Sequence, residues 1–78
     1  MLTVEIVYLK DGTISDEVEL YFDKEGLEQL FERLNHLRDG KTDHLHLMSE
    51  EWGLGDLNEE PHKENNRIAH HLRMTLIE

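Results

Sequence analysis

The spacing of the apolar residues changes along this chain, and this change limits the folds that it can adopt. Apolar and polar residues alternate over residues 2–9 and again over 14–22, as in β-strands with one buried face. Over residues 24–39 the apolar residues instead recur at intervals of three and four: Leu27, Leu30, Phe31, Leu34 and Leu37. Asp23 is a suitable helix N-cap and Gly40 a suitable stop. The pattern therefore predicts two strands followed by an amphipathic helix.

Residues 10–12, Lys-Asp-Gly, separate the two strands and predict a hairpin turn. We favour a three-residue loop with Gly12 in the left-handed conformation, because this register pairs Val4 with Val18. A two-residue Asp-Gly loop would place apolar residues beside acidic ones. The favoured register leaves Asp16 on the apolar face, so we expect Asp16 near an edge or a bulge.

The residue pattern in the second half of the chain predicts two more strands and a long loop. Residues 43–48 alternate between inward Leu and outward His, and residues 67–77 alternate again with His70 on the inward side. Between them, residues 49–66 are polar and form a long loop, a length that is usually functional or mobile. The predicted fold of residues 1–78 is a single α+β domain of order β-β-α-β-β, a four-stranded antiparallel sheet with one helix packed on one face.

Charge limits the partners that this chain can take. Eighteen Asp and Glu against eight Lys and Arg give a formal net charge of −10. Such a field repels nucleic acid and anionic membranes and attracts basic surfaces, although acidity also serves solubility alone. The chain has no Cys and no apolar run that approaches a membrane span, so we expect a soluble, cytoplasmic protein without disulfides.

Catalytic and metal-binding patterns are weak. Ser15 and Ser49 lack the context of a nucleophile elbow and no phosphate loop is present, so we expect no enzyme activity and no cofactor. His44, His46 and His71 could share one sheet face and bind Zn²⁺ or Cu²⁺. No carboxylate accompanies them in a short motif, so the favoured interpretation is surface histidines that pack on the sheet, with no metal.

Two acidic groups are the candidates for contact with a partner. On the outer sheet face the favoured register puts Glu5 opposite Glu17, and the only Trp lies among the acidic residues of the long loop. Carboxylates would steer a basic partner and an exposed aromatic ring would anchor it; alternatively, Trp52 folds back over the open end of the core. The predicted partner-binding residues are Glu5, Glu17, Glu19, Tyr21, Glu50, Glu51, Trp52 and Asp56.

Short motifs in the C-terminal half add a family resemblance. They are His44-Leu45-His46-Leu47, Trp52-Gly53, Asp56-Leu57 and His71-Leu72. These motifs resemble a family of small bacterial immunity proteins from polymorphic-toxin systems, catalogued as immunity protein 32. The resemblance implies an inhibitor that binds and neutralises a cognate toxin by stoichiometric occlusion, and the charge favours a basic toxin such as a nuclease.

Two other functions stay open at the level of sequence. The chain could be a small His-rich metal-binding domain, using the three histidines named above. It could instead be a homo-oligomeric accessory domain that associates through exposed Val7 and Leu9. The expected oligomeric state is a monomer or a homodimer.

Overall fold

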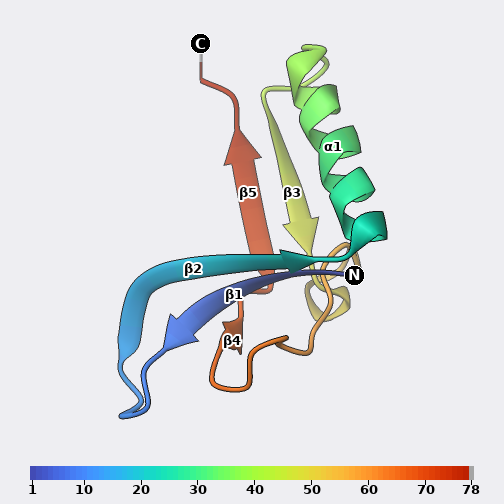
Figure 1. Cartoon of the computed structure of the whole chain (residues 1–78). Helices are drawn as coiled ribbons and strands as arrows, with labels where there is room; N and C mark the ends of the chain where they lie inside the picture. The colour runs from blue at the N-terminus through green and yellow to red at the C-terminus, as the bar shows by residue number, and fades with distance from the viewer. Residues whose placement is uncertain (78) are drawn as a thin grey trace.

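The computed structural model describes residues 1–77 and shows an α+β fold with one long helix and antiparallel strands (Figure 1). The elements in chain order are β1 (Leu2–Tyr8), β2 (Ile14–Phe22), α1 (Lys24–Arg38), β3 (His44–Met48), the short 3₁₀ helix η1 (Glu50–Trp52), β4 (Arg67–Ile68) and β5 (His71–Thr75). The prediction of an α+β fold with one helix and antiparallel strands is confirmed. Within residues 1–77, no helix is long and apolar enough to cross a membrane.

The strands form two sheets, so the prediction of one four-stranded sheet is wrong. The first sheet has the order β2-β1-β4 and the second pairs β3 with β5. The expected last strand, 67–77, is broken in the middle. The N–H of Ala69 donates to the carbonyl of Val4 at 2.8 Å, whereas the carbonyl of His70 accepts from the N–H of Ser49 at 2.9 Å. Consecutive residues thus bond to different sheets, and the chain passes from one sheet to the other at this point.

The β1–β2 hairpin has the expected three-residue loop but not the expected register along its whole length. Gly12 has φ +87°, and the Leu9 N–H donates to the Thr13 carbonyl at 2.9 Å. Val4 nevertheless pairs with Leu20, not with Val18. The cause is a bulge between Ile6 and Tyr8, where a single residue of β1 faces residues 15–17 of β2. The bulge leaves Asp16 exposed, so its carboxylate does not have to enter the apolar face.

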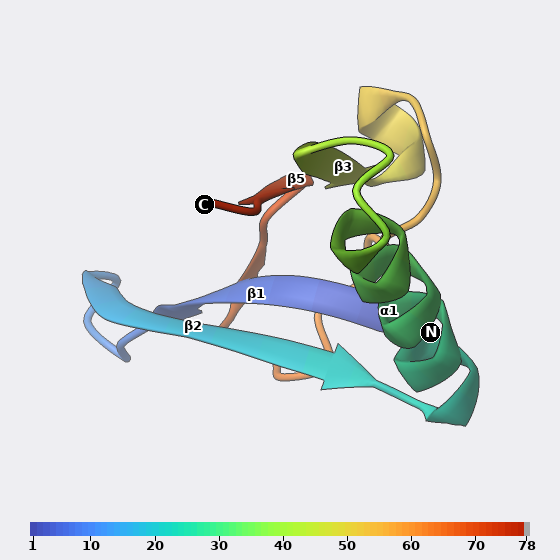
Figure 2. The same ribbon diagram turned by 90° about the horizontal axis from the view of Figure 1, so that it is seen from above.

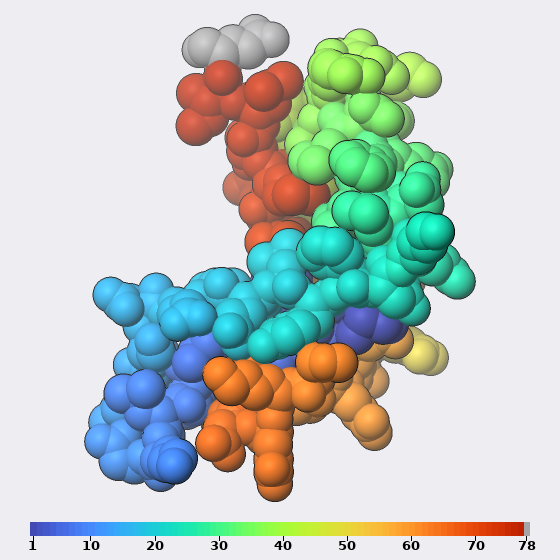
Figure 3. All heavy atoms as spheres, viewed as in Figure 1, coloured from blue at the N-terminus to red at the C-terminus, as the bar shows by residue number. Residues whose placement is uncertain are grey.

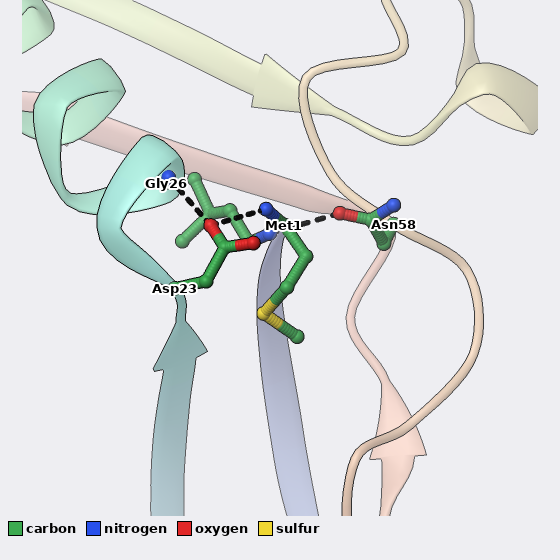
Figure 4. Close-up of polar contacts among 5 residues, drawn as sticks. Met1, Asp23, Gly26 and Asn58 are labelled. Carbon is green, nitrogen blue, oxygen red and sulfur yellow. Dashed lines mark hydrogen bonds and ion pairs between the residues drawn. The ribbon is translucent and has the colours of Figure 1, made fainter.

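The start of α1 is tied to the N-terminus of the chain. Asp23 is the N-cap, and its Oδ1 accepts from the Gly26 N–H at 2.9 Å and from the Met1 ammonium at 2.6 Å (Figure 4). The hydrogen bond from the ammonium, followed by that from Gly26, holds the pKa of Asp23 below its ordinary value. On the other side of β1, the Leu2 N–H donates to Asn58 Oδ1 at 2.8 Å. One turn of helix, the first strand and the long loop therefore meet at the first two residues.

A small core lies where α1, β1 and the β3–β5 sheet converge. Its buried members are Leu2, Val4, Leu37, Leu45, Leu47 and Leu57. Viewed from above, α1 lies beside β3, while β5 lies beyond β3 and the β1–β2 hairpin extends away as an arm (Figure 2). The molecule is accordingly elongated, with extents of 43 × 26 × 22 Å.

Replacement of Gly26 by Ala tests the packing of α1 against the N-terminus. Helix propensity alone favours Ala by about 1 kcal/mol. A Cβ at this position, however, would overlap the backbone carbonyl oxygen of Met1. We expect Gly26→Ala to lower the free energy of unfolding by about 2–3 kcal/mol, measured by urea denaturation. Glu28→Ala, at an exposed position of the same helix, is the control and should change it by less than about 0.5 kcal/mol.

Candidate partner-binding surface

Trp52 projects from the surface on the loop that follows β3. Its side chain is 57% exposed, and its ring is stacked on His70 with centroids 6.0 Å apart and an interplanar angle of 3°. His70 is itself held by Ser49, whose Oγ lies 2.7 Å from the ring Nδ1. The interpretation in which Trp52 covers the open end of the core does not match this geometry. Leu57, only 3% exposed, belongs to the core instead.

The loop around Trp52 is closed by Asp56. Its carboxylate accepts from Arg33 of α1 at 2.6 Å and from the Met48 N–H at 3.2 Å. The Leu57 N–H donates to the Met48 carbonyl at 3.1 Å, which returns the chain to the end of β3. Gly53 and Gly55 have φ of +129° and +79°, so the reversal uses conformations that favour glycine. Asp56 therefore stabilises the loop from inside and is not displayed on it.

The outer face of the β3–β5 sheet carries His44, His46 and His71, as the sequence suggests. His46 Nδ1 and His71 Nε2 are 2.7 Å apart, and the rings are stacked at 4.9 Å. Burial, followed by the neighbouring His71, lowers the pKa of His46 below its ordinary value of 6.5. The two nitrogens that face each other are joined by a hydrogen bond, so a metal ion could use them as ligands only after the rings turn apart.

A different group brings possible metal ligands closer together. Among residues 1–77, ligand atoms of Glu51, Glu59 and His70 lie within 4.8 Å of one another. The two carboxylates are exposed and His70 is half-buried. Glu59 also accepts from the Glu51 N–H at 2.8 Å, so the group holds the η1 turn to the loop that follows.

Glu5 is buried and cannot contact a partner in this conformation. Its side chain is 0% exposed because residues 58–66 cover the outer face of β1. The carboxylate accepts from the N–H groups of His62 at 2.8 Å and Lys63 at 3.3 Å. Thr3 Oγ1 and Asn66 Nδ2 also donate to it, at 2.5 and 2.9 Å. Burial acts to raise the pKa of Glu5, but these four hydrogen bonds together lower it below its ordinary value.

Asn66 also resolves the repulsion between neighbouring acidic residues. Glu5 pairs with Glu19 across the strands, not with Glu17 as expected. Asn66 Nδ2 donates to one carboxylate oxygen of each, at 2.9 Å in both cases, so one amide bridges the two charges. This bond, followed by one from the Tyr21 hydroxyl, lowers the pKa of Glu19.

Tyr21 is engaged by the same covering segment. Its ring is stacked on His62 with centroids 4.7 Å apart, and its hydroxyl donates to Glu19 at 3.0 Å. Burial, followed by this carboxylate, raises the pKa of Tyr21. Sequence reasoning missed the structural role of Asn66 and His62. The signal in the sequence was the pair of acidic residues expected on one sheet face, because two neighbouring carboxylates need a hydrogen-bond donor between them.

The structure thus sorts the predicted residues by exposure. Glu17, Glu50, Glu51 and Trp52 are exposed; Glu19, Tyr21 and Asp56 are half-buried and hydrogen-bonded within the chain; Glu5 is fully buried. The long loop joins the two regions, because Trp52 lies near its start and His62 near its end. No protein-family model, curated protein or solved structure matches the chain.

Replacement of Glu5 by Gln tests the buried network. The amide nitrogen of Gln would face N–H donors, so we expect the free energy of unfolding at pH 7 to fall by about 2–3 kcal/mol. Because the folded pKa of Glu5 is lowered, its contribution is present above the ordinary value of 4.5 and is lost as the pH falls through the folded value. The difference between wild type and Glu5→Gln should therefore shrink in acid.

Urea denaturation at several pH values measures this difference. Glu17→Gln removes an exposed carboxylate from the neighbouring strand and is the matched control. It should change stability by less than about 0.5 kcal/mol. Equal stability of Glu5→Gln and wild type at pH 7 would contradict the role assigned to the network.

Proposed function

We propose that the chain is an immunity protein that binds a cognate bacterial toxin domain and neutralises it by stoichiometric occlusion, without chemistry of its own. The observation that supports the proposal is Trp52, a large exposed ring that stacks on His70 in an acidic loop. A Trp is among the residue types most enriched at the energetic centres of protein interfaces. The resemblance of the motifs around it to immunity protein 32 supplies the class of partner.

Contacts within the chain hold the loop around Trp52. The ring of Trp52 lies parallel to that of His70 in an offset stack, Ser49 holds His70, and Asp56 is fixed by Arg33 of α1. Binding by a side chain that is already in place avoids the entropic cost of ordering it. An exposed aromatic residue that is positioned in this way is suited to anchor a partner.

Charge favours a basic partner. Glu50 and Glu51 precede Trp52 directly and are exposed, in a chain whose net charge is −10. Toxins that cleave nucleic acid present basic surfaces to their substrate, and an acidic inhibitor can cover such a surface. The proposed partner is therefore a toxin domain with a positive active site, such as a nuclease, met in the cytoplasm of the producing cell.

Outer residues of β2 form a second candidate contact. Glu17 is exposed, and Glu19 and Tyr21 are half-buried beside the covering segment. Their internal hydrogen bonds fix their positions and leave part of each side chain accessible. We assign the anchoring role to Trp52 and the steering role to the exposed carboxylates.

Substitution of Trp52 tests the anchoring role. The assay co-expresses the chain with the toxin domain encoded by a neighbouring gene, scores survival, and measures the affinity of the purified pair by calorimetry. We expect Trp52→Ala to abolish protection and to weaken binding by about 30-fold or more, as for a central interface residue. Leu54→Ala, two residues away and 59% exposed, is the control.

The control should protect cells as wild type does. Circular dichroism of both variants checks that the fold is retained. Full protection by a folded Trp52→Ala protein would show that this loop is not the anchor. Absence of any complex between the wild-type chain and the toxin domain would overturn the proposed function itself.

Charge reversal at Glu50 and Glu51 tests steering. We expect the double variant Glu50→Lys and Glu51→Lys to slow association by about tenfold or more at low ionic strength and to flatten its salt dependence. Stopped-flow association at two salt concentrations measures both effects. The same reversal at Glu25 and Glu28 of α1 is the control, since it changes the net charge equally. If both pairs slow association to the same extent, only the net charge matters and the loop has no special role.

A further inference from the structure

The chain exposes more surface than a compact monomer of its size. Its accessible surface is 5797 Å² for a mass of 9.3 kDa. The scaling for compact monomers gives about 5,000 Å², so the excess is about 800 Å². The radius of gyration, 13.5 Å, also exceeds the value of about 11.5 Å expected for a chain of this length.

The excess surface includes a large apolar part. Among residues 1–77, eleven large apolar side chains are exposed, whereas seven apolar residues are buried. Six of the exposed ones come from β2, from α1 and from the segment after β5, and we call them the open apolar face: Val18, Leu20, Phe22, Phe31, Leu34 and Leu76. An apolar area of this kind on a small acidic chain indicates a surface that is covered in solution.

The register shows why β2 contributes to this face. Phe22 pairs with Leu2 and Leu20 pairs with Val4, so the side chains of Leu20 and Phe22 lie on the same sheet face as the core. The core elements cover Leu2 and Val4 of β1, whereas β2 is an edge strand of this sheet and its residues Leu20 and Phe22 stay exposed (Figure 1). The apolar face of β2 therefore continues outward from the core without a cover.

The apolar surface next to β2, on α1 and β5, is also uncovered. The helix lies beside β3, so Leu37 is buried while Phe31 and Leu34 on its flank are 53% and 46% exposed. Beyond β3, Leu72 and Met74 of β5 are packed against the core but only partly buried. In the space-filling view the side chains of α1, β2 and β5 lie together on one side of the molecule (Figure 3).

We propose that the open apolar face is the interface of a two-fold symmetric homodimer of this chain. The area supports this assignment. The excess over the whole chain, about 800 Å², is similar in size to the share that each partner contributes to a standard interface of about 1,600 Å². Small domains with too little core commonly complete it by association with a second copy.

Charge supports a second copy as the partner on this face. Two chains of net charge −10 repel each other, so a contact between them is favoured where carboxylates are absent. Positions 18, 20 and 22 of β2, and positions 27, 30, 31 and 34 of α1, carry no ionisable side chain. A basic toxin would instead require acidic residues at its contact, and these surround Trp52. The dimer inference is thus independent of the proposed function.

The test begins with the mass of the wild-type protein in solution. Sedimentation equilibrium at about 50 µM, above the micromolar limit expected for an interface of this size, should give twice the mass of one chain. Phe31→Glu and Val18→Glu each place a charge on the face at an exposed position, and both should give the monomer mass of 9.3 kDa. Leu54→Glu, at an equally exposed position outside the face, should remain dimeric.

Two further measurements distinguish a dimer formed through this face from association through another surface. In a mixture of ¹³C-labelled and unlabelled chains, intermolecular nuclear Overhauser effects should join Val18 or Leu20 to Phe31 of the other copy. Phe31→Glu should keep a helical circular dichroism spectrum and protection against the toxin, whereas Trp52→Ala should remain dimeric. The dimer can therefore be disproved while the immunity function stands. Equally, the immunity function can be disproved while the dimer stands.

A wild-type chain that sediments at 9.3 kDa at this concentration would overturn the inference. Dimers that persist in both Phe31→Glu and Val18→Glu would overturn it as well, because the contact would then lie elsewhere. If the toxin complex, and not a second copy, buries Phe31, the face belongs to the toxin and the inference also fails.

Discussion

The buried carboxylate of Glu5 ties the first strand to the end of the long loop and so holds the two halves of the chain together. A charge inside a sheet is stable only when donors surround it, and here the donors come mostly from the distant segment 62–66. That segment consequently lies flat on β1, and it covers the outer face of the sheet. Removal of the charge would leave several N–H groups without an acceptor, so the carboxylate and the covering segment require each other.

The long loop consequently has two parts with different roles. Its second part is structural, since Asn66 bridges Glu5 and Glu19 and His62 stacks on Tyr21. Its first part returns to β3, where the Leu57 N–H donates to the Met48 carbonyl. In this part Trp52 is exposed and stacks on His70. Because both ends of the loop are held by hydrogen bonds, to β3 at Leu57 and to Glu5 at His62, the acidic turn between them has a defined shape.

Two small sheets and one helix leave this chain with a modest core and an arm. The crossing of the chain between sheets at Ala69 and His70 separates the β1–β2 hairpin from the β3–β5 pair. One helix cannot cover the inner faces of both, and the apolar residues beyond its reach remain exposed. The proposed partner contact on the loop and the proposed dimer contact on the open apolar face use different surfaces, so the two proposals are compatible.

Local patterns in the sequence are sufficient to predict the two alternating strands, the helix from its N-cap, the Gly12 turn and the outward histidines. These features follow from periodicity and capping, which act between near neighbours. The bulge, the division into two sheets, the burial of Glu5 and the exposure of Trp52 become visible only in the folded chain. Each of them depends on contacts between residues far apart in the sequence, such as Glu5 with Asn66, and no local pattern records which distant donor will meet a given carboxylate.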